Sequence, residues 1–194
     1  MSRVTKSVAS ALLGMLLLGG VVGCIDQTAD ANAAINAANA QAQTYSALDA
    51  EITSLMDEAG AVDFTPEGAT AGIEKIDEAV AKFEERKTVI AAIKAEFGKI
   101  ADMDVDETIK TYAAQQVEIA DLLAQMDDLG VKMLADTKSL YELIASGSTD
   151  TARAEELSKA VEATAAELEA LDTKVTEKQA ASDKYFEDNN LSGE

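Results

Sequence analysis

The side chains that could carry out chemistry in this sequence are carboxylates. The chain has 194 residues with no histidine and one cysteine, Cys24. Without histidine there is no imidazole base, no Ser-His-Asp or Cys-His arrangement and no histidine ligand for zinc, haem or a di-iron site. One cysteine makes neither an internal disulfide nor a cysteine-rich metal site. The sequence therefore predicts a non-enzymatic protein without cofactor or metal, and no paired acids pointing into a cleft.

Three alternating aspartates, Asp102, Asp104 and Asp106, resemble the opening of a calcium-binding loop. An EF-hand has glycine at its sixth position and glutamate at its twelfth, where this chain has Glu107 and Ala113. Because the motif fails, we expect these acids to cap a helix, with Asp104 and Glu107 forming a capping box. A weak, carbonyl-rich cation site is the alternative.

The N-terminal segment has the pattern of a secretory signal. Arg3 and Lys6 precede an apolar stretch over residues 8–23, and no acidic residue occurs before Asp26. The pattern indicates export across a membrane. An uncleaved signal anchor is an alternative, because residues 7–25 are just long enough to span a bilayer. Simple secretion with a free thiol is another.

The segment ends in Val21-Val22-Gly23-Cys24, which resembles the lipobox of prokaryotic lipoproteins. The resemblance implies cleavage before Cys24 and transfer of a diacylglyceryl group to its sulfur. Acyl chains such as palmitate would then hold the protein on the extracytoplasmic face of the cell membrane, because two or more chains anchor firmly. Cys24 is accordingly the expected lipidation site.

The chain is strongly acidic, with a formal net charge of −20. Removal of residues 1–23 would take away Arg3 and Lys6 and leave a charge of −22. Such a charge excludes nucleic acid as a partner, because the phosphate backbone would be repelled. We expect most of the charge to lie on solvated helix faces.

Helical periodicity dominates the rest of the chain. Alanine is abundant, there is one proline, and apolar residues recur at alternating steps of three and four. We expect helices near 30–59, 66–101, 105–145 and 149–187. Their short connections predict an all-α, elongated, antiparallel up-down-up-down four-helix bundle with coiled-coil-like heptad packing. A three-helix antiparallel coiled coil with a loose N-terminal helix is the alternative.

The expected organisation is a signal peptide at 1–23, a lipidated cysteine and tether at 24–30, the bundle at 31–188 and a frayed tail at 189–194. Thr65 and Pro66 predict the start of the second helix, and the 146–149 segment predicts a glycine stop followed by serine or threonine caps. The start of the first helix, the 102–107 turn and the C-terminus should share the membrane-proximal end. The 60–68 loop and the 146–149 turn should share the distal end.

Polar or small residues interrupt the apolar stripes, and we expect them to control helix register. They are Gln116, Gly130, Thr137, Thr164, Lys178 and Ser182. A small-molecule pocket near Gly130 is the alternative. Phe64 precedes the capping Thr65, so it forms either a hydrophobic staple or an exposed contact for a partner.

The overall layout resembles the cell-wall-binding lipoproteins of Gram-positive bacteria. The resemblance rests on Val21-Val22-Gly23-Cys24 and on heptad helices such as residues 77–87. It implies a lipid-anchored, helical surface protein that acts as a spacer, an envelope-interaction module or an accessory subunit, with an envelope protein or the cell wall as partner. A small-molecule-binding or sensor-like bundle is the alternative function, and the oligomeric state stays open.

Overall fold

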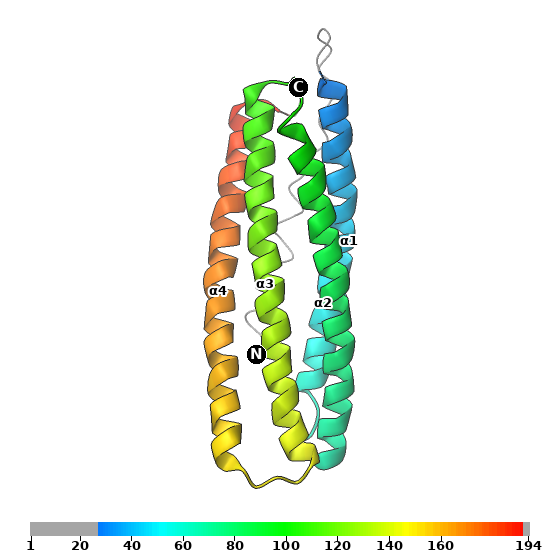
Figure 1. Ribbon diagram of the computed structural model, residues 1–194, viewed down its shortest axis with the longest axis vertical. Coiled ribbons are helices and arrows are strands. Elements are labelled where there is room, and N and C mark those ends of the chain that lie inside the picture. The colour runs from blue at the N-terminus through cyan, green and yellow to red at the C-terminus, as the bar shows by residue number, and fades with distance from the viewer. Residues whose placement is uncertain (1–26, 192–194) are drawn as a thin grey trace.

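The computed structural model describes residues 27–191, which form four long helices (Figure 1). They are α1 (Thr28–Gly60), α2 (Pro66–Ile100), α3 (Glu107–Ala145) and α4 (Thr151–Asp188). The helices run alternately up and down, which confirms the predicted all-α four-helix bundle. The longest helix, α3, has 39 residues and is about 58 Å long. The signal segment, Cys24 and residues 192–194 lie outside the described residues.

Each helix packs against the next along the chain, so α1 contacts α2, α2 contacts α3, and α3 contacts α4. Helix α1 buries Ile35, Tyr45 and Ile52, and is therefore an integral part of the bundle. The alternative with a loose N-terminal helix is wrong. The fourth side, between α1 and α4, is less closely packed than the three sides made by consecutive helices. Within residues 27–191, no helix combines the length and apolar character that crossing a bilayer requires.

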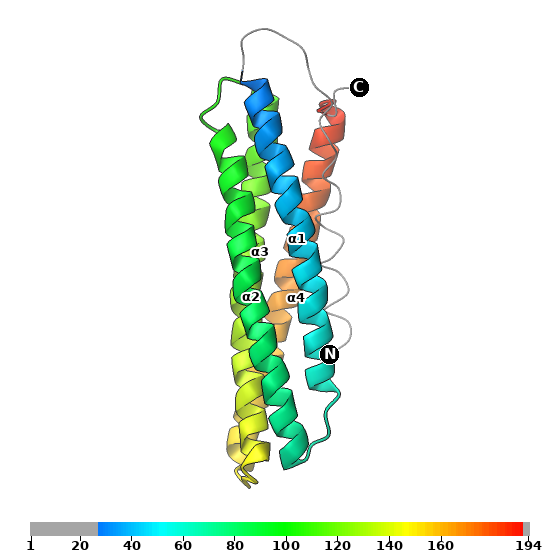
Figure 2. The same ribbon diagram turned by 90° about the vertical axis from the view of Figure 1, so that its right-hand side faces the viewer.

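The two ends of the bundle hold different parts of the chain (Figures 1 and 2). The start of α1, the loop at 101–106 and the end of α4 lie together at one end, here called the base. The loops at 61–65 and 146–150 lie at the opposite end, here called the tip. This grouping is the one that the connectivity predicts.

The helix caps agree only in part with prediction. Thr65 caps α2 as expected, with its hydroxyl accepting from the Gly68 amide at 3.1 Å ahead of Pro66. The predicted capping box of Asp104 is wrong, because α3 begins at Glu107 and Asp106 provides its cap. The Asp106 carboxylate accepts from the Thr108 amide at 2.8 Å.

The turn before α4 follows the expected glycine stop but uses a different cap. Gly147 has φ of 66°, a left-handed conformation that glycine adopts without a steric penalty. The cap of α4 is Asp150, which accepts from the Arg153 amide at 2.9 Å. Ser148 supports this turn by accepting from the Asp150 amide.

The base is closed by a reciprocal pair of hydrogen bonds between Gln27 and Asp104. The Gln27 amide donates to the Asp104 carbonyl at 3.1 Å, and the Asp104 amide donates to Oε1 of Gln27 at 2.8 Å. The Gln27 side chain therefore joins α1 to the α2–α3 loop instead of capping its own helix. Because α1 already begins at Thr28, the tether expected through residue 30 ends earlier.

The buried apolar side chains form two clusters, one above the other. The base cluster includes Ile35, Tyr45, Ile90, Phe97, Tyr112, Leu123, Val175 and Phe186. The tip cluster includes Ile52, Ile76, Phe83, Leu134 and Tyr141. The core is therefore interrupted between these two groups.

Several polar residues in the stripes link neighbouring helices, as expected for register control. Gln116 donates to the buried Ser182 hydroxyl at 2.9 Å, and Lys132 donates to Thr164 at 3.1 Å. Lys178 departs from the prediction because it is exposed and pairs with Glu118 across the α3–α4 surface. The interior position on α4 is taken instead by Gln179.

The interior stripes also shift at two places. On α4, Phe186 is buried, whereas Tyr185, three residues after the buried Ser182, is only half-buried. On α3, Leu134 and Tyr141 are the buried residues beyond Gly130, whereas Met133 is only half-buried. The heptad spacing was correct at these places, but the phase was wrong by one residue.

Gly130 allows a close contact between α2 and α3. A Cβ atom at this position would lie 2.7 Å from two atoms of the Phe83 ring, closer than carbon atoms pack. Gly98, also within a helix, has no atom within 4 Å of the place a Cβ would take. The two glycines therefore differ in what they contribute to packing.

Gly130→Ala should lower the free energy of unfolding by about 1–3 kcal/mol, because the Phe83 ring must leave its position. Gly98→Ala should instead raise it by about 0.5–1 kcal/mol, since alanine favours the helix and meets nothing. Urea denaturation of the two variants checks both signs. A stabilising Gly130→Ala would show that the close contact does not matter.

Candidate functional site

Three charged residues lie where the core is interrupted, one on each of the first three helices. They are Asp49 of α1, Arg86 of α2 and Asp127 of α3. Arg86 occupies an interior position because it continues the spacing of three and four from Phe83 to Ile90. The helix periodicity thus directs a guanidinium group into the bundle, at the level where the base and tip clusters meet.

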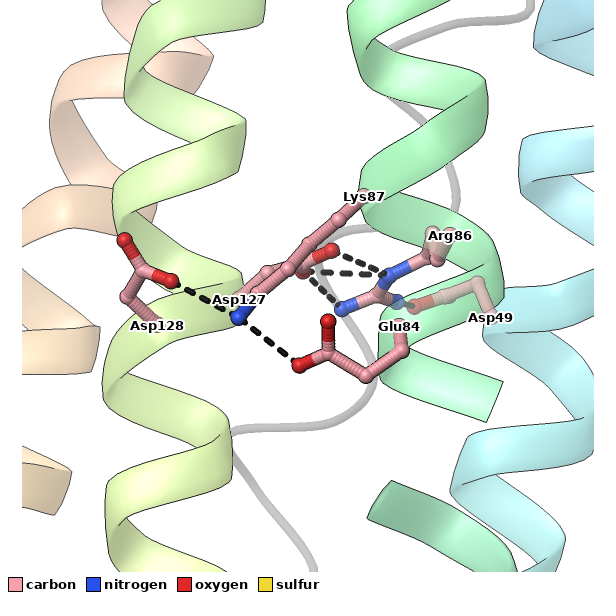
Figure 3. A network of polar contacts seen from close by, with 6 residues as sticks. All are labelled: Asp49, Glu84, Arg86, Lys87, Asp127 and Asp128. Carbon is pink, nitrogen blue, oxygen red and sulfur yellow. Dashed lines mark hydrogen bonds and ion pairs between the residues drawn. The ribbon is translucent and has the colours of Figure 1, made fainter. Parts of the chain in front are cut away.

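The Arg86 guanidinium is held by two carboxylates (Figure 3). Its Nε donates to Oδ1 and Oδ2 of Asp127 at 3.1 and 3.3 Å, and its Nη2 also bonds Asp127. Its Nη1 donates to Oδ1 of Asp49. This ionic cluster of Asp49, Arg86 and Asp127 therefore joins three helices through one planar cation, which suits the fork of donors that arginine offers.

The ionic cluster is almost fully removed from solvent. The exposed fraction of the side chain is 0% for Asp127, 7% for Arg86 and 11% for Asp49. The Arg86 guanidinium carbon also lies 5.0 Å from the centre of the Tyr45 ring and 4.8 Å from that of Phe83. Aromatic faces at these distances attract a cation, and they offset part of the cost of burying it.

Burial is the main cause of the shifted acidities of the two carboxylates. Burial raises the pKa of Asp49, with Arg86 acting in the opposite direction. Burial also raises the pKa of Asp127, against the attraction of Arg86. Burial alone would lower the pKa of Arg86, but Tyr45 and the two carboxylates outweigh it and raise that pKa overall. Arg86 is therefore charged, and the carboxylates retain protons more readily than exposed ones do.

A second ion-pair group lies on the outer side of the cluster (Figure 3). The Lys87 ammonium lies 2.8 Å from Asp128 and 3.0 Å from Glu84. These acids are exposed, so water screens their attraction to Lys87. Lys87 and Arg86 are neighbours in sequence but occupy opposite environments, which makes them a matched pair for mutation.

A cavity of about 170 Å³ lies next to the ionic cluster and extends toward the tip. Asp49, Arg86 and Tyr45 contribute to its wall, and most of the remaining wall is apolar. These further side chains include Ile52, Met56, Phe83, Met126, Met133, Leu134, Val161 and Leu168. All four helices contribute, and Gly130 is among the lining residues. A cavity therefore lies near Gly130, and binding of a small molecule there stays a prediction.

The two acids of the cluster lie differently with respect to the cavity. Asp49 borders it and Asp127 does not, and Arg86 bonds both of them. Within residues 27–191, no group of three or more acidic, cysteine or histidine side chains is placed to hold a metal ion. The site can exclude water and present one buried charged wall to a small guest.

The two site residues predicted from the sequence, Phe64 and Cys24, are not part of the ionic cluster. Phe64 is 78% exposed in the tip loop, so it does not form a hydrophobic staple, and its role as a partner contact stays a prediction. Cys24 lies outside the described residues.

The sequence analysis did not identify the ionic cluster, although one signal was present: Arg86 continues the apolar spacing of α2. Asp49 and Asp127 carry no such signal, since each follows an apolar residue, Leu48 or Met126, that is itself buried.

Comparison of the chain with protein-family models, with curated protein sequences and with solved structures gave no match in any of the three. The site is therefore interpreted from its own geometry.

Arg86→Met should lower the free energy of unfolding by about 3–5 kcal/mol, because two buried carboxylates lose their cation. Lys87→Met is the matched control and should cost less than about 1 kcal/mol, since its partners are exposed. Urea denaturation monitored by circular dichroism measures both. Equal effects of the two substitutions would mean that the buried cluster does not stabilise the bundle.

The raised pKa of Asp49 predicts a pH dependence of stability. The folded chain binds this proton more tightly than the unfolded chain, so its contribution to stability is largest at low pH. That contribution falls as the pH rises from the ordinary carboxyl pKa of 3.8 through the raised value. Asp49→Asn should therefore reduce the loss of stability between pH 3.8 and a pH above the raised value.

Asp57→Asn is the control for this measurement, because Asp57 is exposed on the same helix and has no ion pair within the described residues. Unfolding free energies at the two pH values should show the wild-type slope in this variant. A slope in Asp49→Asn as steep as that of Asp57→Asn would contradict the prediction.

Proposed function

We propose that this protein is a non-enzymatic, lipid-anchored module on the extracytoplasmic face of a cell membrane, acting as a spacer and interaction module of the envelope. The segment Val21-Val22-Gly23-Cys24 supports a lipid on Cys24. The observation that carries the proposal is the position of α1, which begins at the base only four residues after Cys24.

The few residues between Cys24 and the bundle support the base as the end that faces the membrane. Two residues separate Cys24 from Gln27, and Gln27 is bonded to the α2–α3 loop. Three residue steps reach at most about 11 Å. A lipid on Cys24 would therefore hold the base close to the bilayer, and the acidic loop there would be repelled from an anionic surface.

In this proposal the long helices hold the tip away from the membrane, where it can contact a partner. With α3 about 58 Å long, the tip would stand roughly that far from the base. Phe64, exposed in the tip loop, is the residue we assign to contact with an envelope protein or a cell-wall partner. Charges along the outer helix faces would keep the bundle solvated.

A second candidate function is binding of a small molecule within the bundle. The cavity of about 170 Å³ beside the ionic cluster supports it. The cavity lies on the tip side of Arg86, away from the end assigned to the membrane. Anchoring and binding are compatible, because they use opposite halves of the molecule.

Cys24→Ser should release the full-length protein from the membrane fraction, because the thiol that would carry the lipid is lost. Fractionation of cells expressing the wild-type chain, Cys24→Ser and Ile25→Val measures this. The Ile25→Val control keeps the cysteine and should stay with the membrane. Retention of Cys24→Ser in the membrane fraction would contradict lipid anchoring and favour an uncleaved signal anchor.

A further inference from the structure

The size of the cavity limits its occupant to about one ring. A cavity of about 150 Å³ lined by apolar side chains holds a single benzene molecule. The cavity here is about 170 Å³, which leaves room for a ring with a short substituent. Met56, Met126 and Met133 line it, and the flexible thioether side chain adapts to guests of different shape.

The polar wall determines the charge that such a guest can carry. Nε and Nη2 of Arg86 are bonded to Asp127, and Nη1 is bonded to Asp49. The two carboxylates would repel an anionic guest by their charge, although one N–H of Nη1 and one N–H of Nη2 have no acceptor among the described residues. Asp49 borders the cavity and accepts from Arg86 through Oδ1, whereas its Oδ2 accepts no hydrogen bond from the described residues.

The charges around the cavity sum to an excess of negative charge when the acids are ionised. The cluster itself contains two carboxylates and one guanidinium. Asp172 of α4 adds a further negative charge near Tyr45, and Tyr45 is part of the cavity wall. Lys87 faces Asp127 from the outer side, but it is already shared between Asp128 and Glu84. A cation inside the cavity would therefore be attracted.

We propose that the cavity binds a small monocyclic amine in its cationic form, with the ring among the tip-cluster side chains and the ammonium group at Asp49. The proposal rests on the small-molecule-binding candidate above and adds the chemical class of the ligand. A neutral ring would gain only apolar contacts here, whereas an ammonium group also pairs with the carboxylate that Arg86 leaves partly free.

The burial of Asp49 supports this pairing. Burial raises the pKa of Asp49, which means that its ionised form lacks solvation. An ammonium group at Asp49 would favour the ionised carboxylate. Entry is open from the less closely packed side of the bundle, where Thr53 of α1 and Ala165 of α4 are half-buried and border the cavity.

Three probes of similar size and different charge test the proposal: benzylamine, benzyl alcohol and benzoate. Titration of the full-length protein, followed by the NMR signals of labelled methionine methyl groups, gives both affinity and location. Met56, Met126 and Met133 line the cavity, while Met103 lies in the loop at the base and serves as an internal control. Benzylamine should shift the three cavity signals at concentrations about tenfold lower than benzyl alcohol does, and benzoate should not bind.

Two substitutions and one control variant show where the probes bind. Asp49→Asn should remove the preference for benzylamine over benzyl alcohol, whereas Asp57→Asn should keep it. Ala165→Phe should fill the cavity and abolish the shifts from both probes. Because the wild-type protein already gives the ratio between the two probes, the proposal can be judged even where a variant does not fold.

The outcomes distinguish the amine proposal from the broader small-molecule-binding candidate. Benzyl alcohol or benzoate binding as well as benzylamine would overturn the amine proposal and leave the small-molecule-binding candidate standing. Absence of shifts with all three probes would overturn both. Shifts from benzylamine that persist in a folded Ala165→Phe variant would place binding elsewhere and overturn the proposed site.

Discussion

The architecture depends on one buried cation, Arg86, and on the two carboxylates that hold it. Burying charges costs free energy, and the cost is offset only when the partners meet with good geometry. Asp49 and Asp127 come from different helices, so their bonds to Arg86 form only when α1, α2 and α3 have the right relative height. Apolar contacts tolerate sliding by a turn far better than this cluster does. The ionic cluster therefore sets the relative height of α1, α2 and α3 more tightly than the apolar contacts of the base and tip clusters would.

Much of the fold could be predicted from the sequence because it follows from periodicity. The four helices, their order and the grouping of their ends all result from stripes of apolar residues and short connections. The phase of a stripe was harder to predict, as Lys178 and Gln179 show. Seven-residue spacing accommodates either residue on the interior face, and only the packing against α3 decides between them.

The candidate site was less predictable, and the reason is physical. Arg86 could have been found, since it interrupts an apolar stripe on the interior face of α2. Its partners could not, because whether Asp49 and Asp127 face inward depends on the rotation of two other helices. The cavity results from side chains of all four helices, which no single stretch of sequence records. A cavity does lie near Gly130, but the space that its missing side chain leaves is filled by the Phe83 ring.

The hydrogen bonds between Gln27 and Asp104 have a mechanical consequence. Tension applied to the chain ahead of α1 first reaches Gln27, and from there it passes both into α1 and into the loop between α2 and α3. Because this loop follows the end of α2, the force is shared between α1 and α2 at the base instead of falling on α1 alone. Many side-chain contacts then share the force at once. A bundle joined in this way resists being unravelled through its own point of attachment.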